Sequence, residues 1–143
     1  MGIKPHNDSF DKMLERMKTF AMNLVSGKGM KIEFDIPGNI PGVTAGMEFR
    51  KNLFLVFKEA VNNCAKYSEA ENVSIHFRFD NGRLEMEIKD DGKGFDESKL
   101  ERINGISNMR DRAMELDGEF NLSSKPGEGT VVRLVAAFNG KKA

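Results

Sequence analysis

Residues 52–67 read NLFLVFKEAVNNCAKY, and they carry the strongest structural signal in this 143-residue chain. Apolar side chains recur across residues 48–68 at the spacing of one wide buried helical face. Glu59, Asn63 and Lys66 follow one another at intervals of four and three residues, so on a helix they share an edge beside that face. The stretch therefore predicts a helix with a core-facing side and a polar edge.

The polar edge has the side chains that a magnesium ion and phosphate groups need. Asn62 and Asn63 stand together in mid-helix, although asparagine is a poor helix former and needs a reason to be there. Amide and carboxylate oxygens suit Mg²⁺, and the ammonium group of Lys66 suits phosphoryl oxygens. The alternative is an ordinary solvated helix face. Cys64 falls on the apolar side, so we predict that it lies in the core.

Alternating apolar and polar residues predict strands, and turn-forming residues separate them. The expected strands are 30–36, 73–79, 84–88, 120–123 and 130–138, with a further helix at 106–116. Asp80-Asn81-Gly82-Arg83 predicts a hairpin turn, and Gly118 predicts a left-handed helix end. This order of elements predicts an α+β fold, a two-layer sandwich of a mixed β-sheet with helices packed on one face.

Residues 10–24 carry a second helical pattern, preceded by Asp8 or Ser9 as a capping residue. Spacings of three and four residues alternate between its apolar positions, which are Phe10, Met13, Met17, Phe20 and Leu24. Such a seam fits a helix packed on its own domain, and it also fits the end of a helical hairpin or coiled coil that begins upstream. We therefore expect a single domain at residues 28–143, with residues 1–27 as an N-terminal helix that extends it.

Composition argues against several classes of protein. The 22 basic and 22 acidic residues balance, and no basic cluster stands out, so we do not expect a nucleic-acid partner. Cys64 is the single cysteine, which rules out an intrachain disulfide and favours a cytoplasmic location. No apolar run approaches the roughly 20 residues of a membrane-spanning helix. A longer parent protein anchored in the inner membrane stays compatible with this composition.

Three more segments have the chemistry of a nucleotide site, each at the end of a predicted element. Asp90-Asp91-Gly92-Lys93-Gly94 follows a strand, where a carboxylate can accept the amine of adenine and glycines allow close backbone approach. Asn104-Gly105-Ile106 begins a helix, whose free N–H groups and dipole favour phosphate. Gly127-Glu128-Gly129-Thr130 is a tight loop, and we expect its threonine hydroxyl to hydrogen-bond toward Asp90 across the sheet. Each segment alone is also compatible with an ordinary turn or helix start.

These segments, in this order, resemble the Bergerat ATP-binding fold shared by histidine kinases, gyrase, a class of heat-shock chaperones and mismatch-repair ATPases. The resemblance covers residues 30–138. Residues 52–63 and 105–113 look most similar to bacterial sensor histidine kinases of the branch that includes nitrate sensors and lipid-desaturation sensors. Two positions depart from the pattern, because Tyr67 stands where the family often has histidine and Ile103 where it usually has glycine. The second departure bears on lid closure and catalytic rate more than on binding.

The resemblance implies a role for each matching residue. Glu59 and Lys66 would be catalytic, Asn63 would ligate Mg²⁺, and Asp90 would hold the adenine amine. Further positions implied to contact the nucleotide are Asn62, Tyr67, Gly92, Gly94, Phe95, Gly105, Ile106 and Thr130, together with Asn63 and Lys66. Residues 95–104 would form a short mobile lid. The implied cofactors are ATP and Mg²⁺.

The implied function is that of the Mg-ATP-binding catalytic domain of a sensor histidine kinase in two-component signal transduction. Such a domain donates the γ-phosphate to a histidine on a separate dimerisation domain. His6 lies near the terminus and His76 in a predicted strand, so neither is a suitable acceptor, and we expect the acceptor histidine upstream of this chain. Residues 1–27 would then be the end of the upstream dimerisation hairpin.

The expected partners are the dimerisation domain of the same protein and a response regulator, within a homodimeric parent protein. The isolated domain is expected to be a monomer. Two alternatives stay open at this point. One is an anti-sigma-factor-type protein serine kinase of the same fold, and the other is a non-catalytic nucleotide-binding regulatory module.

Overall fold

The computed structural model describes residues 5–37, 46–98 and 105–138. Its helices are α1 (Pro5–Gly27), α2 (Met47–Asn63) and α3 (Ile106–Glu115), and a π-helical turn, η1 (Cys64–Ser68), continues α2. Its strands are β1 (Lys31–Asp35), β2 (Asn72–Asp80), β3 (Arg83–Asp90), β4 (Glu119–Ser124) and β5 (Thr130–Ala137). The lid expected at 95–104 falls largely outside the described residues.

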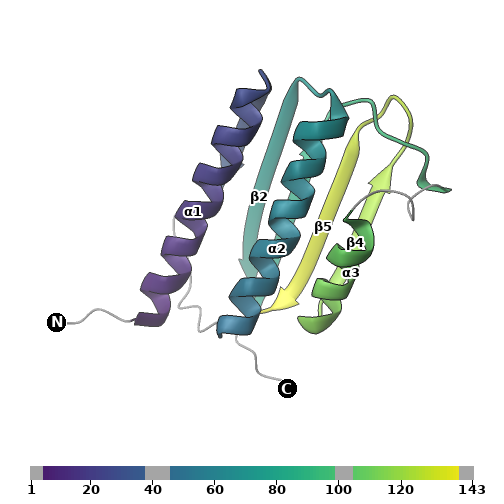
Figure 1. Cartoon of the computed structure of the whole chain (residues 1–143). Helices are drawn as coiled ribbons and strands as arrows, with labels where there is room; N and C mark the ends of the chain where they lie inside the picture. The colour runs from purple at the N-terminus through teal and green to yellow at the C-terminus, as the bar shows by residue number, and fades with distance from the viewer. Residues whose placement is uncertain (1–4, 38–45, 99–104, 139–143) are drawn as a thin grey trace.

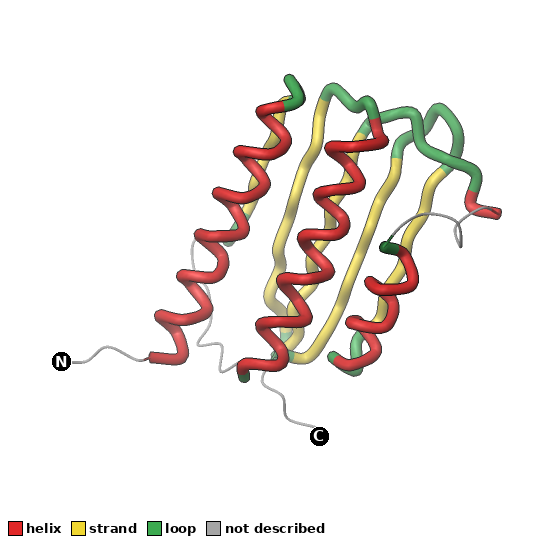
Figure 2. The backbone as a smooth tube through the Cα atoms, viewed as in Figure 1, coloured by secondary structure: helices red, strands yellow, loops and turns green. Residues whose placement is uncertain are grey.

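The described elements form two layers, with the three helices lying side by side over one face of the sheet (Figures 1 and 2). The five strands run in the order β1-β2-β3-β5-β4. Strand β1 is parallel to β2, and the other neighbouring strands are antiparallel. The predicted α+β two-layer sandwich of a mixed sheet is therefore confirmed.

The hairpin between β2 and β3 has the turn that its sequence predicts. Asn81 and Gly82 both have positive φ, 53° and 74°, as a two-residue turn of type I′ requires. Alternate residues of the two strands then point toward the helices, and the pair Ile75 and Ile88 lies in register at the centre. This register carries Asp90, at the end of β3, onto the helix-facing side of the sheet.

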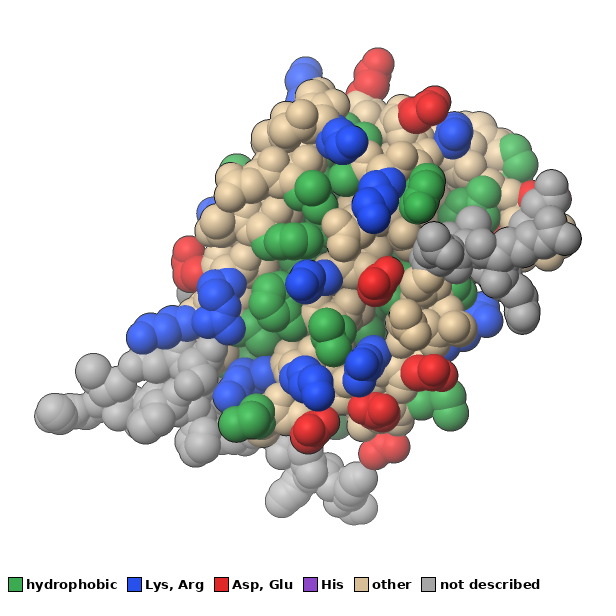
Figure 3. Space-filling view, viewed as in Figure 1, with side chains coloured by type: hydrophobic (Ala, Val, Ile, Leu, Met, Phe, Trp, Pro, Cys, Tyr) green, Lys and Arg blue, Asp and Glu red, His purple; other side chains and the backbone are tan. Residues whose placement is uncertain are grey.

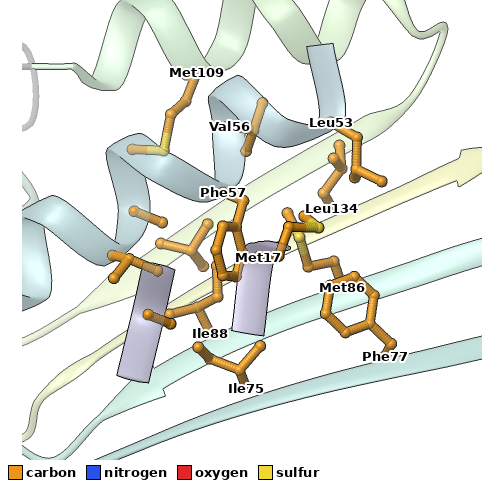
Figure 4. Close-up of a cluster of buried hydrophobic side chains, with 14 of the residues drawn as sticks. Met17, Leu53, Val56, Phe57, Ile75, Phe77, Met86, Ile88, Met109 and Leu134 are labelled. Atoms are coloured by element: carbon orange, nitrogen blue, oxygen red, sulfur yellow. The ribbon is translucent and has the colours of Figure 1, made fainter. Parts of the chain in front are cut away.

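The helices and the sheet share one hydrophobic core. Figure 4 shows Met17 of α1, Phe57 of α2 and Met109 of α3 converging on side chains of the sheet such as Leu134. All four of these side chains are fully buried. On the outer side of the helices, basic, acidic and apolar side chains are interspersed (Figure 3).

Helix α1 packs on this core, although with a different stripe from the predicted seam. It begins at Pro5, ahead of the expected cap at Asp8 or Ser9. The buried stripe is Phe10, Met13, Leu14, Met17, Ala21 and Val25, whereas Phe20 and Leu24 are only partly buried. This stripe advances mostly by four residues, as suits a helix lying on a sheet more than a left-handed supercoil. The packing matches the first alternative, and a role as the end of a dimerisation hairpin stays a prediction.

The end of α3 corrects one expectation. Asp117, and not Gly118, adopts the left-handed conformation, with a φ of 56°. The Asp117 and Gly118 N–H groups donate to the carbonyls of Met114 and Ala113, at 3.0 and 2.9 Å, which is a Schellman end with Asp117 as its left-handed residue. Glycine is needed one position later because a Cβ at Gly118 would crowd the Val135 carbonyl.

We predict that Met17→Ala destabilises the domain by about 2–5 kcal/mol, because it removes a fully buried side chain and leaves a cavity. The exposed neighbour provides a control, since Lys18→Ala should change stability by less than about 0.5 kcal/mol. Urea unfolding followed by circular dichroism measures both values. Equal stabilities for the two variants would show that α1 is not part of the core.

Candidate functional site

A cavity of about 270 Å³ lies between the end of α2, the end of β3, the start of β5 and the start of α3. The end of α2 that contributes to its wall is the upper end of that helix in Figure 1. Its size is near the lower limit of small-molecule sites. The lining is mostly apolar and consists of Ala60, Asn63, Cys64, Tyr67, Ser68, Ile88, Asp90, Lys93, Gly94, Phe95, Ile106, Leu122, Thr130 and Val132.

The π-helical turn shapes one wall of this cavity. The α-helix ends at Asn63, and η1 ends where Glu69 adopts a left-handed conformation with a φ of 54°. Within the turn the Ser68 hydroxyl donates to the Cys64 carbonyl at 2.7 Å and accepts the Ala70 N–H at 3.1 Å. The prediction of one continuous α-helix over residues 48–68 is therefore wrong beyond Asn63.

The wider turn also divides the predicted polar edge. Asn63 and Tyr67 line the cavity, and Tyr67 is 48% exposed at its mouth. Glu59, Asn62 and Lys66 are not among the lining residues, and Lys66 is exposed to solvent. Glu59 and Asn63 both lie on α2, but the regular 3.6-residue repeat that grouped Lys66 with them does not hold through a π turn.

Asp90 is the buried carboxylate of the site, with only 4% of its surface exposed. Its Oδ1 accepts the Gly92 backbone N–H at 2.9 Å, and the Cys64 thiol donates to its Oδ2 at 3.4 Å. Burial raises the pKa of Asp90 above its usual value, and the hydrogen bonds from Gly92 and Cys64 oppose that rise. Each carboxylate oxygen has a second lone pair, so Asp90 can accept a further hydrogen bond from a ligand.

Asp91 has a structural role in contrast to its neighbour. Its Oδ1 accepts the backbone N–H groups of Glu71 and Asn72, both at 2.9 Å, and its Oδ2 accepts the Asn72 side-chain amide at 2.8 Å. The hydrogen bonds from the side chain and backbone of Asn72 lower the pKa of Asp91. This exposed carboxylate ties the start of β2 to the end of β3 and so holds Asp90 in place.

Cys64 is buried, as predicted, and it also lines the cavity, which the sequence pattern did not indicate. Burial raises the pKa of its thiol well above the usual value, and the charge of Asp90 and the hydrogen bond to it add to the rise. The thiol therefore stays protonated at neutral pH and acts as a donor to Asp90. Its position directly after Asn63 was the available signal.

The glycines of the Asp90 loop are needed for contacts within the protein. A Cβ at Gly92 would overlap the Ser68 carbonyl, and one at Gly94 would overlap the Lys125 carbonyl. Of the two glycines only Gly94 lines the cavity. Both glycines let other segments of backbone pack around Asp90, and a contact with the base, which the resemblance implies for both, stays a prediction.

Glu59 and Gly105 meet at the start of α3. Gly105 precedes the helix with a φ of 90°, and the Glu59 carboxylate lies where a Cβ on Gly105 would be. The next residue, Ile106, lines the cavity. A helix N-terminus favours negative charge, so the Glu59 carboxylate is favourably placed beside the start of α3. Ile103 and Asn104 lie outside the described residues.

Thr130 lines the cavity but not with the predicted bond. It pairs with Asp90 in the ladder between β3 and β5. Its hydroxyl lies 2.8 Å from the Ser124 hydroxyl, and a backbone hydrogen bond from Thr130 lowers the pKa of Asp90. The expected hydroxyl bond from Thr130 toward Asp90 is replaced by the bond to Ser124. Phe95 and Lys93 also line the cavity, and the Lys93 ammonium is 3.5 Å from the Glu69 carboxylate.

Two negative findings apply to the described ranges 5–37, 46–98 and 105–138. No helix within them is both long and apolar enough to cross a bilayer. No three His, Cys, Asp or Glu side chains within them gather closely enough to form a metal site on their own.

Comparison with known proteins defines the class to which this fold and cavity belong. Residues 49–139 match the family described as histidine kinase-, DNA gyrase B-, and HSP90-like ATPase, and the chain belongs to that family. Within the family it corresponds to the ATP-binding catalytic domain of sensor histidine kinases, as its relatives indicate.

Similar curated proteins include the sensor protein VraS of Staphylococcus haemolyticus, which is 34% identical over 131 residues, and that of Staphylococcus aureus, which is 33% identical. Each alignment covers 90% of this chain but only 36% and 37% of the respective relative. The chain thus spans little more than a third of their length.

Solved structures share the fold at lower identity. Full-length ShkA in complex with AMPPNP has a TM-score of 0.75 at 18% identity, with 94% of this chain and 31% of that chain covered. The Acinetobacter baumannii histidine kinase AdeS has a TM-score of 0.72 at 17% identity, with 92% and 66% covered.

We predict that Cys64→Ala raises the pKa of Asp90 further, because the thiol hydrogen bond stabilises the charged carboxylate. Carboxyl carbon NMR across a pH titration measures the shift as a midpoint at higher pH. Cys64→Ser keeps a donor and should stay nearer to the wild-type midpoint. An unchanged or lower midpoint in Cys64→Ala would contradict the assigned contact.

Proposed function

We propose that this chain binds Mg-ATP in the cavity between α2 and β3 and presents the γ-phosphate to a histidine on a separate dimerisation domain. One observation carries the proposal: Asp90 and Asn63, from different elements, line the same cavity. The buried carboxylate of Asp90 suits the amino group of a base, and the amide of Asn63 suits a metal ion on a phosphate chain. Most of the catalysis is then positioning and charge neutralisation.

The adenine end of the ligand fits the apolar part of the cavity. Ile88, Ile106 and Val132 provide apolar contacts for a base, and Asp90 accepts a hydrogen bond from its exocyclic amine. Burial disfavours the charged form of the Asp90 carboxylate. The amine is a donor, so its hydrogen bond to the carboxylate offsets part of that cost.

The phosphate end lies toward the end of α2 and the start of α3. Lys66 and Tyr67 follow Asn63 on η1, and Lys93 lines the cavity nearby. We infer that Lys66 contacts the phosphates. Its side chain is exposed to solvent, and it lies on the same π-helical turn as Tyr67, which lines the cavity. Gly105 opens α3, and its N-terminal N–H groups favour phosphate. Glu59 is then the carboxylate that orients water at this end.

The residues present fit Mg²⁺ when it is brought by the phosphates. Among the described residues no cluster of three acidic, histidine or cysteine ligands exists, and Mg²⁺ commonly binds through one or two protein oxygens, waters and substrate phosphates. The Asn63 amide is the protein oxygen at hand. When bound, the ion neutralises phosphate charge.

The wider assignments rest on the sensor kinases that this chain resembles. We infer that residues 1–27 end a dimerisation hairpin carrying the acceptor histidine, and that residues 28–143 are the catalytic domain. A response regulator would receive the phosphoryl group. We infer a cytoplasmic domain of a membrane-anchored, homodimeric parent protein. The sequence of residues 52–63 and 105–113 supports membership of the branch that includes nitrate sensors and lipid-desaturation sensors.

We predict that Asp90→Asn weakens ATP binding at least about one hundredfold, because a charge-assisted hydrogen bond is worth about 1.5–3 kcal/mol and an apposed donor adds a penalty. The Gly92 N–H holds an oxygen at the Oδ1 position, so the new amide presents its NH₂ group where Oδ2 stood. Isothermal titration calorimetry measures the affinity.

A matched control lies on the same strand. Glu87 sits on the opposite face of β3, so Glu87→Gln removes a charge without touching the cavity and should bind ATP as the wild type does. An unchanged affinity in Asp90→Asn would show that the base does not bind at Asp90.

We also predict that Asn63→Ala loses most of the Mg²⁺ dependence of ATP binding, since it removes the amide of a cavity-lining residue. Asn62→Ala distinguishes the paired asparagines, because Asn62 does not line the cavity and should keep more of that dependence. Titrations with Mg²⁺ and with EDTA give the comparison. Equal dependence in both variants and in the wild type would refute the metal assignment.

A further inference from the structure

Ser124 lies where three segments of the site meet. It is the last residue of β4 and only 4% exposed. Its hydroxyl accepts the Phe95 N–H at 2.9 Å and contacts the Gly129 carbonyl at 3.0 Å and the Thr130 hydroxyl at 2.8 Å. Its own N–H donates to Glu97 Oε2 at 2.7 Å. Because Phe95 and Thr130 both line the cavity, Ser124 supports the cavity from behind without lining it.

Only one arrangement of the two hydroxyl protons gives every polar group of this cluster a hydrogen-bond partner. A serine hydroxyl has one proton and two lone pairs. The Gly129 carbonyl can only accept, so it takes the Ser124 proton, while the Phe95 N–H can only donate, so it uses one lone pair. The Thr130 hydroxyl must then donate to the remaining lone pair. Buried polar groups are nearly always paired, which favours this arrangement over any that leaves the carbonyl bare.

This arrangement fixes the polarity of the cavity wall. With its proton directed at Ser124, the Thr130 oxygen can offer only lone pairs to a ligand. The Cys64 proton is likewise directed at Asp90. Asp90 and Thr130 pair across β3 and β5, so two acceptors stand side by side at this end of the cavity. A ligand that presents a donor there is favoured, and one that presents a carbonyl oxygen is disfavoured.

The same serine anchors the start of the segment that follows the Asp90 loop. The bonds to the Phe95 N–H and the Glu97 carboxylate attach this segment to the end of β4 at two points. The position of Phe95 in the cavity wall thus depends on Ser124.

We propose that Ser124 is a positioning residue for nucleotide selection: it directs the Thr130 hydroxyl away from the cavity and holds Phe95 against it, so that the site prefers 6-amino over 6-oxo purine nucleotides. This rests on the proposed function, since it concerns how the same cavity recognises its base. Ser124 itself does not contact the ligand.

The test compares ATP with inosine triphosphate, which has an oxo group in place of the 6-amine. In Ser124→Ala the Thr130 hydroxyl is free to donate into the cavity, and the Phe95 N–H loses its acceptor. We expect ATP affinity to fall about tenfold, the worth of one buried hydrogen bond, and inosine triphosphate affinity to fall much less. The preference for ATP over inosine triphosphate should therefore drop at least about fivefold. Calorimetry on the whole chain measures all four affinities.

Matched variants separate positioning from general loosening of the fold. Ser123→Ala, on the exposed phase of β4, should leave both affinities unchanged, and Ser124→Thr, which keeps the hydroxyl, should restore the preference. Thr130→Val removes the directed hydroxyl and should itself reduce the preference. In the double variant, Ser124→Ala should then lower the preference no further.

Each other result counts against the proposal. If Ser124→Ala weakens both nucleotides equally, or if Thr130→Val keeps the wild-type preference, Ser124 has only a structural role. A wild-type preference in Thr130→Val overturns the proposal even where Ser124→Ala fails to fold. Failure of the wild-type chain to bind either nucleotide would overturn the proposed function and this inference together, whereas an unchanged preference in a chain that binds ATP overturns the inference alone.

Discussion

A carboxylate held in a mostly apolar cavity is the constraint on which the rest of this structure depends. Burial disfavours the charge of Asp90, and its pKa rises accordingly. The Gly92 N–H, the Cys64 thiol and the Thr130 backbone offset part of that cost. These donors come from the loop after β3, from η1 and from β5. The hydrogen bonds around the Asp90 carboxylate are therefore complete only when all three segments are in place. The site is therefore coupled to the fold as a whole.

The close approach of backbone segments follows from the same constraint. A Cβ at Gly92 or Gly129 would overlap the carbonyl of Ser68 or of Asp90 itself. Glycine at these two positions lets η1 pack against the loop after Asp90, and lets the start of β5 pack against the Asp90 backbone, without a side chain between. On the solvent side, the exposed Asp91 carboxylate accepts hydrogen bonds from the Glu71 and Asn72 N–H groups and so holds the end of β3 against the start of β2. Two adjacent acidic residues thus do different work, one facing the cavity and one holding the loop.

The fold was predictable from the sequence because strands and turns leave local signals. Alternation gave the strands, and Asn81 and Gly82 gave the hairpin that brings Asp90 to the helix side. The order of the motifs placed Asp90 and Asn63 in one cavity. The π turn was missed because one extra residue per turn hardly changes the apolar spacing of residues 48–68.

Contacts between distant segments left no such signal. The stripe of α1 depends on the surface beneath it, so Leu14 and Val25 replaced part of the predicted seam. The roles of Cys64 and Ser124 arise from hydrogen bonds to residues far along the chain, and no spacing rule reveals those. Thr130 lines the cavity, but its hydroxyl contacts Ser124 on the neighbouring strand and not Asp90, because strand pairing brings the two hydroxyls together.

The most direct test of the central claim is an amide NMR titration of the chain with Mg-ATP. If the nucleotide occupies the cavity around Asp90, the largest shifts will fall on Cys64, Gly94, Ile106 and Thr130, which line it. The amides of His76 and Arg133, whose side chains lie on the opposite face of the sheet, will hardly move. Shifts confined to that opposite face, or no shift at the cavity residues under saturating Mg-ATP, would contradict the account.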